Sequence, residues 1–220
     1  ARAAGVSESS YRLLTRNLVP DMSVIEKLNY QPEFSTPIWD YLSGLVDDER
    51  VQQGQAMLQQ HADTLARVQQ RFGVEPATVV AVWGVESNFG QSLGRYPLVQ
   101  ALGTLSCYGR RQVFFRGELY SAMRILQAGH VAPERLIGSW AGAFGHTQFM
   151  PTTFERLAVD GDGDGKRDLM DNTTDALAST ANFLKGHGWR AGAPYGEGSA
   201  NFEVLREWNR ALVYRKTIVY

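Results

Sequence analysis

A twelve-residue acidic loop, residues 160–171, restricts the folds that are open to this chain. Its sequence is Asp-Gly-Asp-Gly-Asp-Gly-Lys-Arg-Asp-Leu-Met-Asp. Oxygen ligands fall at loop positions 1, 3, 5, 9 and 12, which are occupied by Asp160, Asp162, Asp164, Asp168 and Asp171. Gly165 lies at position 6, where a sharp turn is needed, and Lys166 at position 7 would contribute its backbone carbonyl. This is the EF-hand spacing for a hard cation, so we expect a helix on either side of the loop.

The loop predicts a structural ion rather than a calcium switch. Three alternating aspartates would repel one another without a cation, which disfavours the alternative of a solvated acidic loop. Asp171 stands where such loops usually carry Glu, and its shorter side chain is less readily bidentate, so we expect modest affinity. Because the sequence contains one such loop, a paired calcium sensor is disfavoured. We interpret the ion, Ca²⁺ or Na⁺, as a clip that holds the fold, and we expect no cofactor for catalysis.

A dense apolar run ends in a single carboxylate, Glu86, within the segment Val79–Gly90. Pro76 suits the first turn of a helix and Gly90 its end, so the sequence predicts a short buried helix over residues 76–88. Glu86 would lie in the last turn, where burial and the negative end of the helix dipole both raise its pKa. A general acid that works near neutral pH requires such a shift. On spacing alone, a Glu paired with an arginine or turned to solvent is the commoner outcome.

Helical periodicity fills most of the remaining chain, so the expected class is mainly α. Hydrophobic content of 44%, charged content of 20% and a net charge of −1 describe a globular chain with no electrostatic reason to bind nucleic acid or a membrane surface. The single Cys107 excludes an internal disulfide, and we expect a buried thiol there. Only residues 217–220 have strand character. The expected helices are two short ones within residues 1–30, then 38–46, 47–72, 97–105, 112–128, 151–159 and one capped by Asn172.

Three further clusters have side chains suited to holding a sugar. They are Arg110-Arg111 before Phe114-Phe115, the segment from Ser139 to Pro151 with Gln148, and Trp208-Asn209-Arg210 with Tyr214. For any one cluster alone, packing or solvation is the better explanation. The four histidines, His61, His130, His146 and His187, show no metal-ligand spacing, and we interpret them as surface or loop residues.

Taken together, these pieces resemble the membrane-bound lytic transglycosylase B family, glycoside hydrolase family 103. The matching segments follow the family order from about residue 20 to the end. This match makes a catalytic Glu86 a better interpretation than a Glu paired with an arginine or turned to solvent. They are Gln31-Pro32-Glu33-Phe34, Trp39-Asp40-Tyr41-Leu42, Trp83 to Gly90, Gly109-Arg110-Arg111 with Phe114-Phe115, Gly138 to Ala143, Gln148-Phe149-Met150-Pro151, Asp160 to Asp171 and Trp208-Asn209-Arg210.

The resemblance implies a lysozyme-like catalytic core over residues 76–220, preceded by an α-helical domain over residues 1–75 that wraps it, with the EF-hand-like loop inside the core. It also implies cleavage of the MurNAc–GlcNAc β-1,4 bond of peptidoglycan without water, which leaves 1,6-anhydro-MurNAc ends. Glu86 would be the single acid/base, first protonating the glycosidic oxygen and then taking the proton of the sugar's 6-hydroxyl. The raised pKa of a carboxyl in an apolar pocket follows the known behaviour of lysozyme.

The resemblance also carries over binding roles by position. Ser139 and Gln148 would contact the sugar or orient Glu86, and Ser87 would join them as a substrate contact. Arg110, Arg111 and Phe115 would meet peptide stems or saccharide. Asn209 and Tyr214 would position the muramyl unit and its N-acetyl group.

Two departures from the family and two alternatives accompany this interpretation. Phe144 and Ala211 replace the residues usual in the family, and the segment between Trp189 and Phe202 is several tens of residues shorter than in its members. A hydrolytic muramidase would need a second carboxylate that holds a water. A peptidoglycan-binding scaffold would not need an acid at position 86. Peptidoglycan as substrate predicts a location in the periplasm of a Gram-negative bacterium, with a protein that is soluble or has an outer-membrane lipid anchor in the precursor. We also expect a monomer.

Overall fold

The computed structural model describes residues 1–29 and 47–220. The loop expected at residues 31–37 and the helix expected at 38–46 lie outside the described residues. As the sequence predicts, the described chain is mainly helical; its one sheet has two strands. None of the helices in the described ranges is long and apolar enough to cross a membrane. The elements are η1 (Arg2–Ala4), α1 (Glu8–Thr15), α2 (Ser23–Asn29), α4 (Asp48–Gln60), α5 (Ala62–Phe72), α6 (Pro76–Ser87), β1 (Tyr96–Pro97), α7 (Leu98–Cys107), α8 (Gln112–Gln127), η3 (Pro133–Arg135), β2 (Ile137–Gly138), α9 (Pro151–Leu157), α10 (Thr173–Gly186), α11 (Ala200–Trp208) and α12 (Leu212–Val219).

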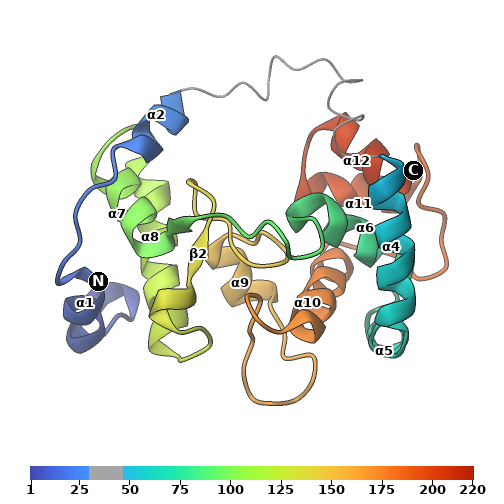
Figure 1. The fold of residues 1–220 in the computed structure, drawn as a ribbon, viewed down its shortest axis with the longest axis horizontal. Helices are drawn as coiled ribbons and strands as arrows, with labels where there is room; N and C mark the ends of the chain where they lie inside the picture. Colours follow the sequence, from blue (N-terminus) through green and yellow to red (C-terminus); the bar gives the residue numbers. More distant parts are fainter. Residues whose placement is uncertain (30–46) are drawn as a thin grey trace.

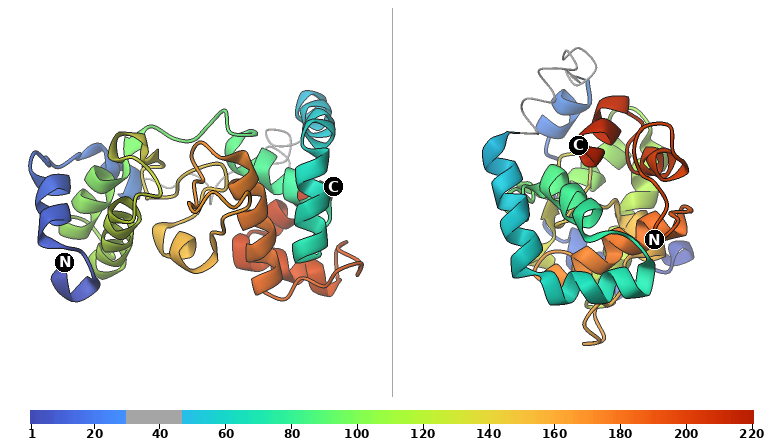
Figure 2. Two further views of the ribbon diagram at one scale, coloured as in Figure 1. Left: turned by 90° about the horizontal axis from the view of Figure 1, so that it is seen from below. Right: turned by 90° about the vertical axis from the view of Figure 1, so that its right-hand side faces the viewer.

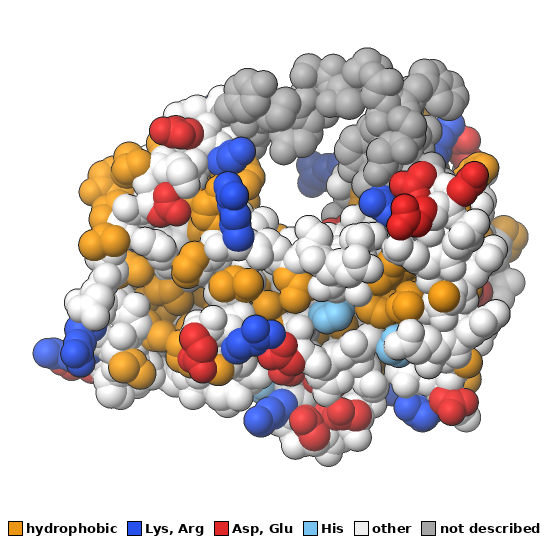
Figure 3. Space-filling model, viewed as in Figure 1, with side chains coloured by type: hydrophobic (Ala, Val, Ile, Leu, Met, Phe, Trp, Pro, Cys, Tyr) orange, Lys and Arg blue, Asp and Glu red, His pale blue; other side chains and the backbone are white. Residues whose placement is uncertain are grey.

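The helices form two lobes (Figure 1). The first, here the α8 lobe, contains α1, α2, α7 and α8, and the second, the α6 lobe, contains α4, α5, α6, α10, α11 and α12. The view from below shows α9 and the irregular chain of residues 138–150 between the lobes (Figure 2). The face between the lobes is hollowed, and the C-terminal end of α6 points toward this hollow (Figures 1 and 3).

A single connected core runs through both lobes. It includes Val6 and Leu28 from the N-terminal segment, Leu65 and Phe72 from α5, and Leu102 from α7. In the α6 lobe α5 packs on α10, and in the α8 lobe α2 packs on α7. The described helices of residues 1–75 are therefore divided between the two lobes and share the core of residues 76–220. The domain boundary at residue 75 stays a prediction.

A small antiparallel sheet lies beside α7. Tyr96 pairs with Gly138 and Pro97 with Ile137. Further bridges from Gly138 to Phe144 and from Phe144 to Phe149 continue the pairing through residues 138–149. A Cβ on Gly138 would lie 2.2 Å from the Ala143 carbonyl oxygen, so this close pairing requires glycine.

Several predicted boundaries were wrong. The helix expected over residues 47–72 breaks at His61, which separates α4 from α5. Residues 217–220, expected to have strand character, belong largely to α12, which packs on α6 and α11. Helix α11 was not expected at all. Cys107 is exposed rather than buried.

Candidate active site

Helix α6 ends abruptly beside Glu86. Pro76 occupies its first turn as predicted, but the helix stops at Ser87, and the cap is Asn88 rather than Gly90. Asn88 is left-handed, with φ 48°, and its N–H bonds to the carbonyls of Gly84 and Trp83. Phe89 and Gly90 are also left-handed, with φ 55° and 83°. Such backbone is uncommon for residues other than glycine and clusters at functional sites.

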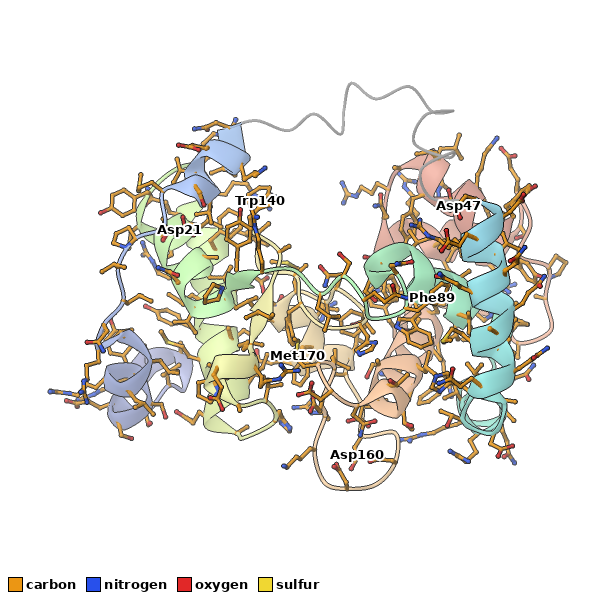
Figure 4. All side chains as sticks on the ribbon, in the orientation of Figure 1. Asp21, Asp47, Phe89, Trp140, Asp160 and Met170 are labelled. Carbon is orange, nitrogen blue, oxygen red and sulfur yellow. The ribbon has the colours of Figure 1, made fainter. Side chains whose placement is uncertain are left out.

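The ring of Phe89 folds back onto the helix that precedes it. It lies edge-on to Trp83 with 5.5 Å between ring centroids. A Cβ on Gly84 would come within 2.8 Å of this ring, so glycine at position 84 leaves the space that Phe89 fills. Figure 4 shows Phe89 on the α6 side of the hollow and Trp140 on the α8 side.

Two donors hold one oxygen of the Glu86 carboxyl. The Tyr214 hydroxyl donates to Oε1 over 2.6 Å, and the Trp208 indole N–H donates to the same atom over 2.8 Å. No hydrogen bond from the described residues reaches Oε2. The carboxyl is therefore fixed through one oxygen while the other is left for chemistry.

The environment of Glu86 raises its pKa to about 7. Burial among protein atoms disfavours the charged form and outweighs the bonds from Tyr214 and Trp208, which favour it. The residue still keeps part of its surface accessible, as a group that meets a substrate must. A pKa near 7 allows the same carboxyl to give a proton and then take one.

One short connection supplies both donors. Trp208 is the last residue of α11, and Tyr214 lies in the first turn of α12. Between them Asn209 turns the chain, because its side-chain Oδ1 accepts the N–H of Ala211 over 2.9 Å. Sequence reasoning placed Trp208 in the same cluster as Asn209 and Tyr214 but assigned a binding role to the latter two alone. The indole N–H next to Asn209 was the available signal.

The residues predicted to contact sugar divide into two groups. Tyr214 contacts Glu86 from the first turn of α12, and Asn209 follows Trp208 in the turn between α11 and α12. Ser139 and Gln148 lie in the chain between the lobes. Gln148 donates from Nε2 to the Gly145 carbonyl over 2.9 Å, and Ser139 accepts the Ala143 N–H over 3.0 Å. Neither side chain hydrogen-bonds Glu86.

Ser87 lies next to Glu86 but faces away from any substrate. It is 1% exposed. Its hydroxyl donates to the His146 carbonyl over 2.7 Å and accepts the Gly90 N–H over 3.1 Å. The structure thus gives Ser87 a bracing role in place of the predicted substrate contact.

His146 lies in a loop, as predicted, and this loop places its ring against α6. Its Nδ1 accepts the Trp83 indole N–H over 2.9 Å. Burial lowers the pKa of its imidazole. A Cβ on Gly90 would lie 2.2 Å from the His146 ring, so the chain that leaves α6 passes directly over it.

The arginine–aromatic cluster lies at the N-terminal end of α8. Arg110 donates to the Leu28 carbonyl at the end of α2 over 2.9 Å. The Arg111 guanidinium lies 4.2 Å from the centroid of the Phe114 ring, a cation–π contact. Phe115, predicted to meet substrate, is 3% exposed and packs in the core, while Phe114 is 40% exposed. Phe114 is therefore the aromatic of this pair that a ligand can reach.

The acidic loop projects from the opposite side of the molecule to the hollow (Figures 1 and 4). Carboxylate oxygens of Asp160, Asp162 and Asp164 lie within 4.8 Å of one another, as a cation site requires. Asp171 instead forms an ion pair with Arg135, and Asp168 accepts the N–H groups of Met170 and Asp171. The three alternating aspartates converge as a cation site would, although each also accepts hydrogen bonds from within the protein, whereas Asp168 and Asp171 lie outside this cluster.

Asp175, which sequence reasoning did not single out, holds both ends of the acidic loop. It lies in the first turn of α10 and is fully buried. One carboxylate oxygen accepts the Gly161 N–H and the other the Asp168 N–H, each over 2.7 Å. Burial raises the pKa of this carboxyl.

Two helical lobes around one enclosed carboxyl define a lysozyme-like protein. The chain belongs to the family described as the transglycosylase SLT domain, whose model matches residues 1–199. This confirms the resemblance found in the sequence.

Named relatives agree with this family. The chain is 39% identical over 166 residues to membrane-bound lytic murein transglycosylase B of Escherichia coli (strain K12), which covers 75% of this chain and 43% of that protein. The chain thus spans less than half the length of this curated relative.

Solved structures share the fold. The crystal structure of SltB3 from Pseudomonas aeruginosa in complex with NAG-anhNAM-pentapeptide superposes with a TM-score of 0.93 at 35% identity, covering 99% of this chain and 74% of that one. The Escherichia coli lytic transglycosylase Slt35 in complex with calcium gives a TM-score of 0.87 at 26% identity, covering 99% and 86%.

Proposed function

We propose that this chain is a peptidoglycan lytic transglycosylase that cleaves the MurNAc–GlcNAc β-1,4 bond without water. The observation that carries the proposal is the Glu86 carboxyl, held through Oε1 by Tyr214 and Trp208 with its pKa raised to about 7. The names of lytic murein transglycosylase B and of lytic transglycosylase Slt35, and the anhydro-muramyl ligand of SltB3, support it.

The proposed reaction uses one carboxyl twice. Protonated Glu86 gives its proton to the glycosidic oxygen as the bond from that oxygen to C1 of MurNAc breaks. The N-acetyl group of the substrate stabilises the positive C1. The Glu86 carboxylate then takes the proton of the 6-hydroxyl as O6 bonds to C1, which forms the 1,6-anhydro ring and restores the acid.

A second carboxylate is not required in this scheme. Glycosidases with two catalytic carboxyls place them roughly 5–10 Å apart. Within residues 1–29 and 47–220, no Asp or Glu is among the groups that shift the pKa of Glu86. Hydrolysis is the alternative, and its products would carry reducing MurNAc ends.

Substrate contacts are proposed on both sides of the hollow. Tyr214, which contacts Glu86, and Asn209 in the turn before it would meet the muramyl unit, with Ser139 and Gln148 from the chain between the lobes. Arg110 and Arg111 would meet peptide stems, with Phe114 taking the place of Phe115. Basic side chains gather at the edge of the hollow over the α8 lobe (Figure 3), which suits the carboxylates of such stems.

We also propose Ca²⁺ as a structural ion in the acidic loop. Asp160, Asp162 and Asp164 converge, and Slt35 has been solved with calcium. When bound, the ion would neutralise the repulsion among these carboxylates and add no chemistry to the reaction.

The proposed substrate places the protein in the cell envelope, in the periplasm of a Gram-negative bacterium. A lipid anchor in the precursor and a monomeric state remain predictions.

The deciding experiment is mass spectrometry of the soluble products from purified peptidoglycan. We expect muropeptides ending in 1,6-anhydro-MurNAc, one water lighter than reducing-end products. Glu86→Gln is the matched control, and it should abolish release while the protein still folds and binds glycan. Reducing ends from the unaltered protein would establish the muramidase instead, and glycan binding without any release would establish the scaffold.

A further inference from the structure

Trp208, to which the sequence assigned no individual role, takes no part in the reaction steps described above. Trp208 lies 122 residues after Glu86 in the chain, and its indole N–H reaches the same oxygen as the Tyr214 hydroxyl. We propose that Trp208 is a positioning residue which, together with Tyr214, holds Oε1 of Glu86 and thereby reserves Oε2 for both proton transfers. This inference rests on the proposed function, and it assigns a separate task to each oxygen of the Glu86 carboxyl.

The indole is held firmly enough to act in this way. Its ring centroid lies 4.5 Å from that of Phe183 on α10 and 5.4 Å from that of Phe149, which follows Gln148. Both phenylalanines are buried. Aromatic packing from two elements therefore fixes the direction of the N–H bond, and the short turn at Asn209 sets its distance from Tyr214.

Because both donors bind Oε1, the two oxygens of the Glu86 carboxyl have different roles. In the protonated acid, Oε1 accepts both bonds as the carbonyl oxygen, so the proton resides on Oε2. In the carboxylate, the same two bonds stabilise charge on Oε1, and Oε2 stays unengaged by the described residues. The oxygen that gives the proton to the glycosidic bond is then also the one that receives the proton of the 6-hydroxyl, without rotation of the side chain.

The donors also set the pH at which the acid works. Hydrogen bonds to a carboxylate favour its charged form, so both lower the pKa of Glu86 against the effect of burial. The groups acting on this carboxyl are Tyr214 of α12, which packs on α6, and Trp208 at the end of α11. No Lys, Arg, His, Asp or Glu of the described residues is among them.

The test is Trp208→Phe, which removes the N–H donor and keeps a smaller aromatic ring between Phe149 and Phe183. The pKa of Glu86 is measured directly, by NMR titration of protein carrying ¹³C in its Glu side-chain carboxyls, with Glu86→Gln to assign the signal. Removing one bond to a charged group should raise this pKa by about one unit. The high-pH limb of the rate profile on peptidoglycan should move upward by the same amount.

Three further variants separate the donor from the packing. Tyr214→Phe should raise the pKa in the same direction, and the double variant should raise it further. Phe154→Leu loosens the core at a buried ring that contacts Phe144 and not Trp208, so it should lower thermal stability and leave the high-pH limb in place. If Trp208→Phe loses activity with the Glu86 pKa and the limb unmoved, Trp208 only packs and the inference is overturned.

The two readouts distinguish this inference from the proposed function. The NMR titration needs no turnover. A raised pKa in Trp208→Phe together with reducing-end products from the unaltered protein would keep the positioning role and refute transglycosylation. Anhydro products from the unaltered protein, with the Glu86 pKa unmoved in Trp208→Phe, would support transglycosylation and refute the positioning role.

Discussion

Trp83 donates its indole N–H to Nδ1 of His146 over 2.9 Å, and this bond joins α6 to the chain between the lobes. The Ser87 hydroxyl adds a second link, to the His146 carbonyl. The helix that carries Glu86 is thus anchored to this chain by side chains of its own last two turns. Rigid support of this kind keeps a reacting group in place.

Ser87→Ala should cost stability rather than substrate affinity. The change leaves the Gly90 N–H and the His146 carbonyl without their partner, at a cost of about 1–3 kcal/mol in the free energy of unfolding. Urea denaturation measures this cost, and KM for peptidoglycan fragments should stay constant. An increase in KM at unchanged stability would instead restore the substrate contact expected from the sequence.

Glu86→Gln should stabilise the protein in a pH-dependent manner. Because the folded pKa of about 7 lies above the ordinary value of 4.5, stability from this group is fully present below pH 4.5 and is lost as the pH rises through 7. The loss is at most about 3 kcal/mol. Removing the charge should therefore raise the melting temperature at pH 8 relative to the unaltered protein.

At pH 4 the neutral Gln and the protonated Glu should have equal stability, which provides the internal control. A difference of the same size at both pH values would mean that packing, not ionisation, separates the two side chains.

Gly84→Ala should destabilise the fold, because the new methyl group would push on the Phe89 ring at 2.8 Å. Overpacking of this kind costs about 1–3 kcal/mol. Gly117→Ala in α8 is the matched control, since no atom lies within 4 Å of its added Cβ, and alanine there should stabilise by about 0.5–1 kcal/mol. Thermal melts of both variants give the comparison. An increase in melting temperature for Gly84→Ala as well as for Gly117→Ala would show that the Phe89 ring moves aside freely.

Asp164→Asn should weaken the response to calcium. Its Oδ1 accepts the Lys166 N–H over 2.8 Å, and an asparagine oxygen can keep that bond while the charge is lost. Without calcium the melting temperature should stay level or rise slightly, because repulsion within the cluster falls. Millimolar calcium should raise the melting temperature of the unaltered protein and raise that of the variant less. An identical increase in both proteins would place the ion elsewhere.

The sequence predicted features that depend on local chemistry. Pro76 marks the start of α6, Asn172 caps α10 through its side chain, and alternating aspartates form the acidic cluster. The position of Glu86 at the end of a buried helix followed from the same local signals.

Features that depend on tertiary contacts were missed. The β-branched and aromatic residues 217–220 suggested a strand, but packing on α6 makes them helical. The bend at His61 lets its ring lie nearly perpendicular to that of Trp83, with 5.4 Å between the ring centroids. No local pattern reveals this contact. Trp208 reaches Glu86 across 122 residues, and Asp171 is bound by Arg135. Each depends on a partner that periodicity cannot identify.

Asp175 makes the outer part of the acidic loop replaceable as a unit. Its buried side chain joins the Gly161 and Asp168 N–H groups, and Arg167 also bonds back to the protein through His130. Residues 162–166, which lie between these fixed points, are exposed. A designer could therefore graft a different binding loop, or a short neutral turn, over residues 162–166 and leave the fixed points on either side in place.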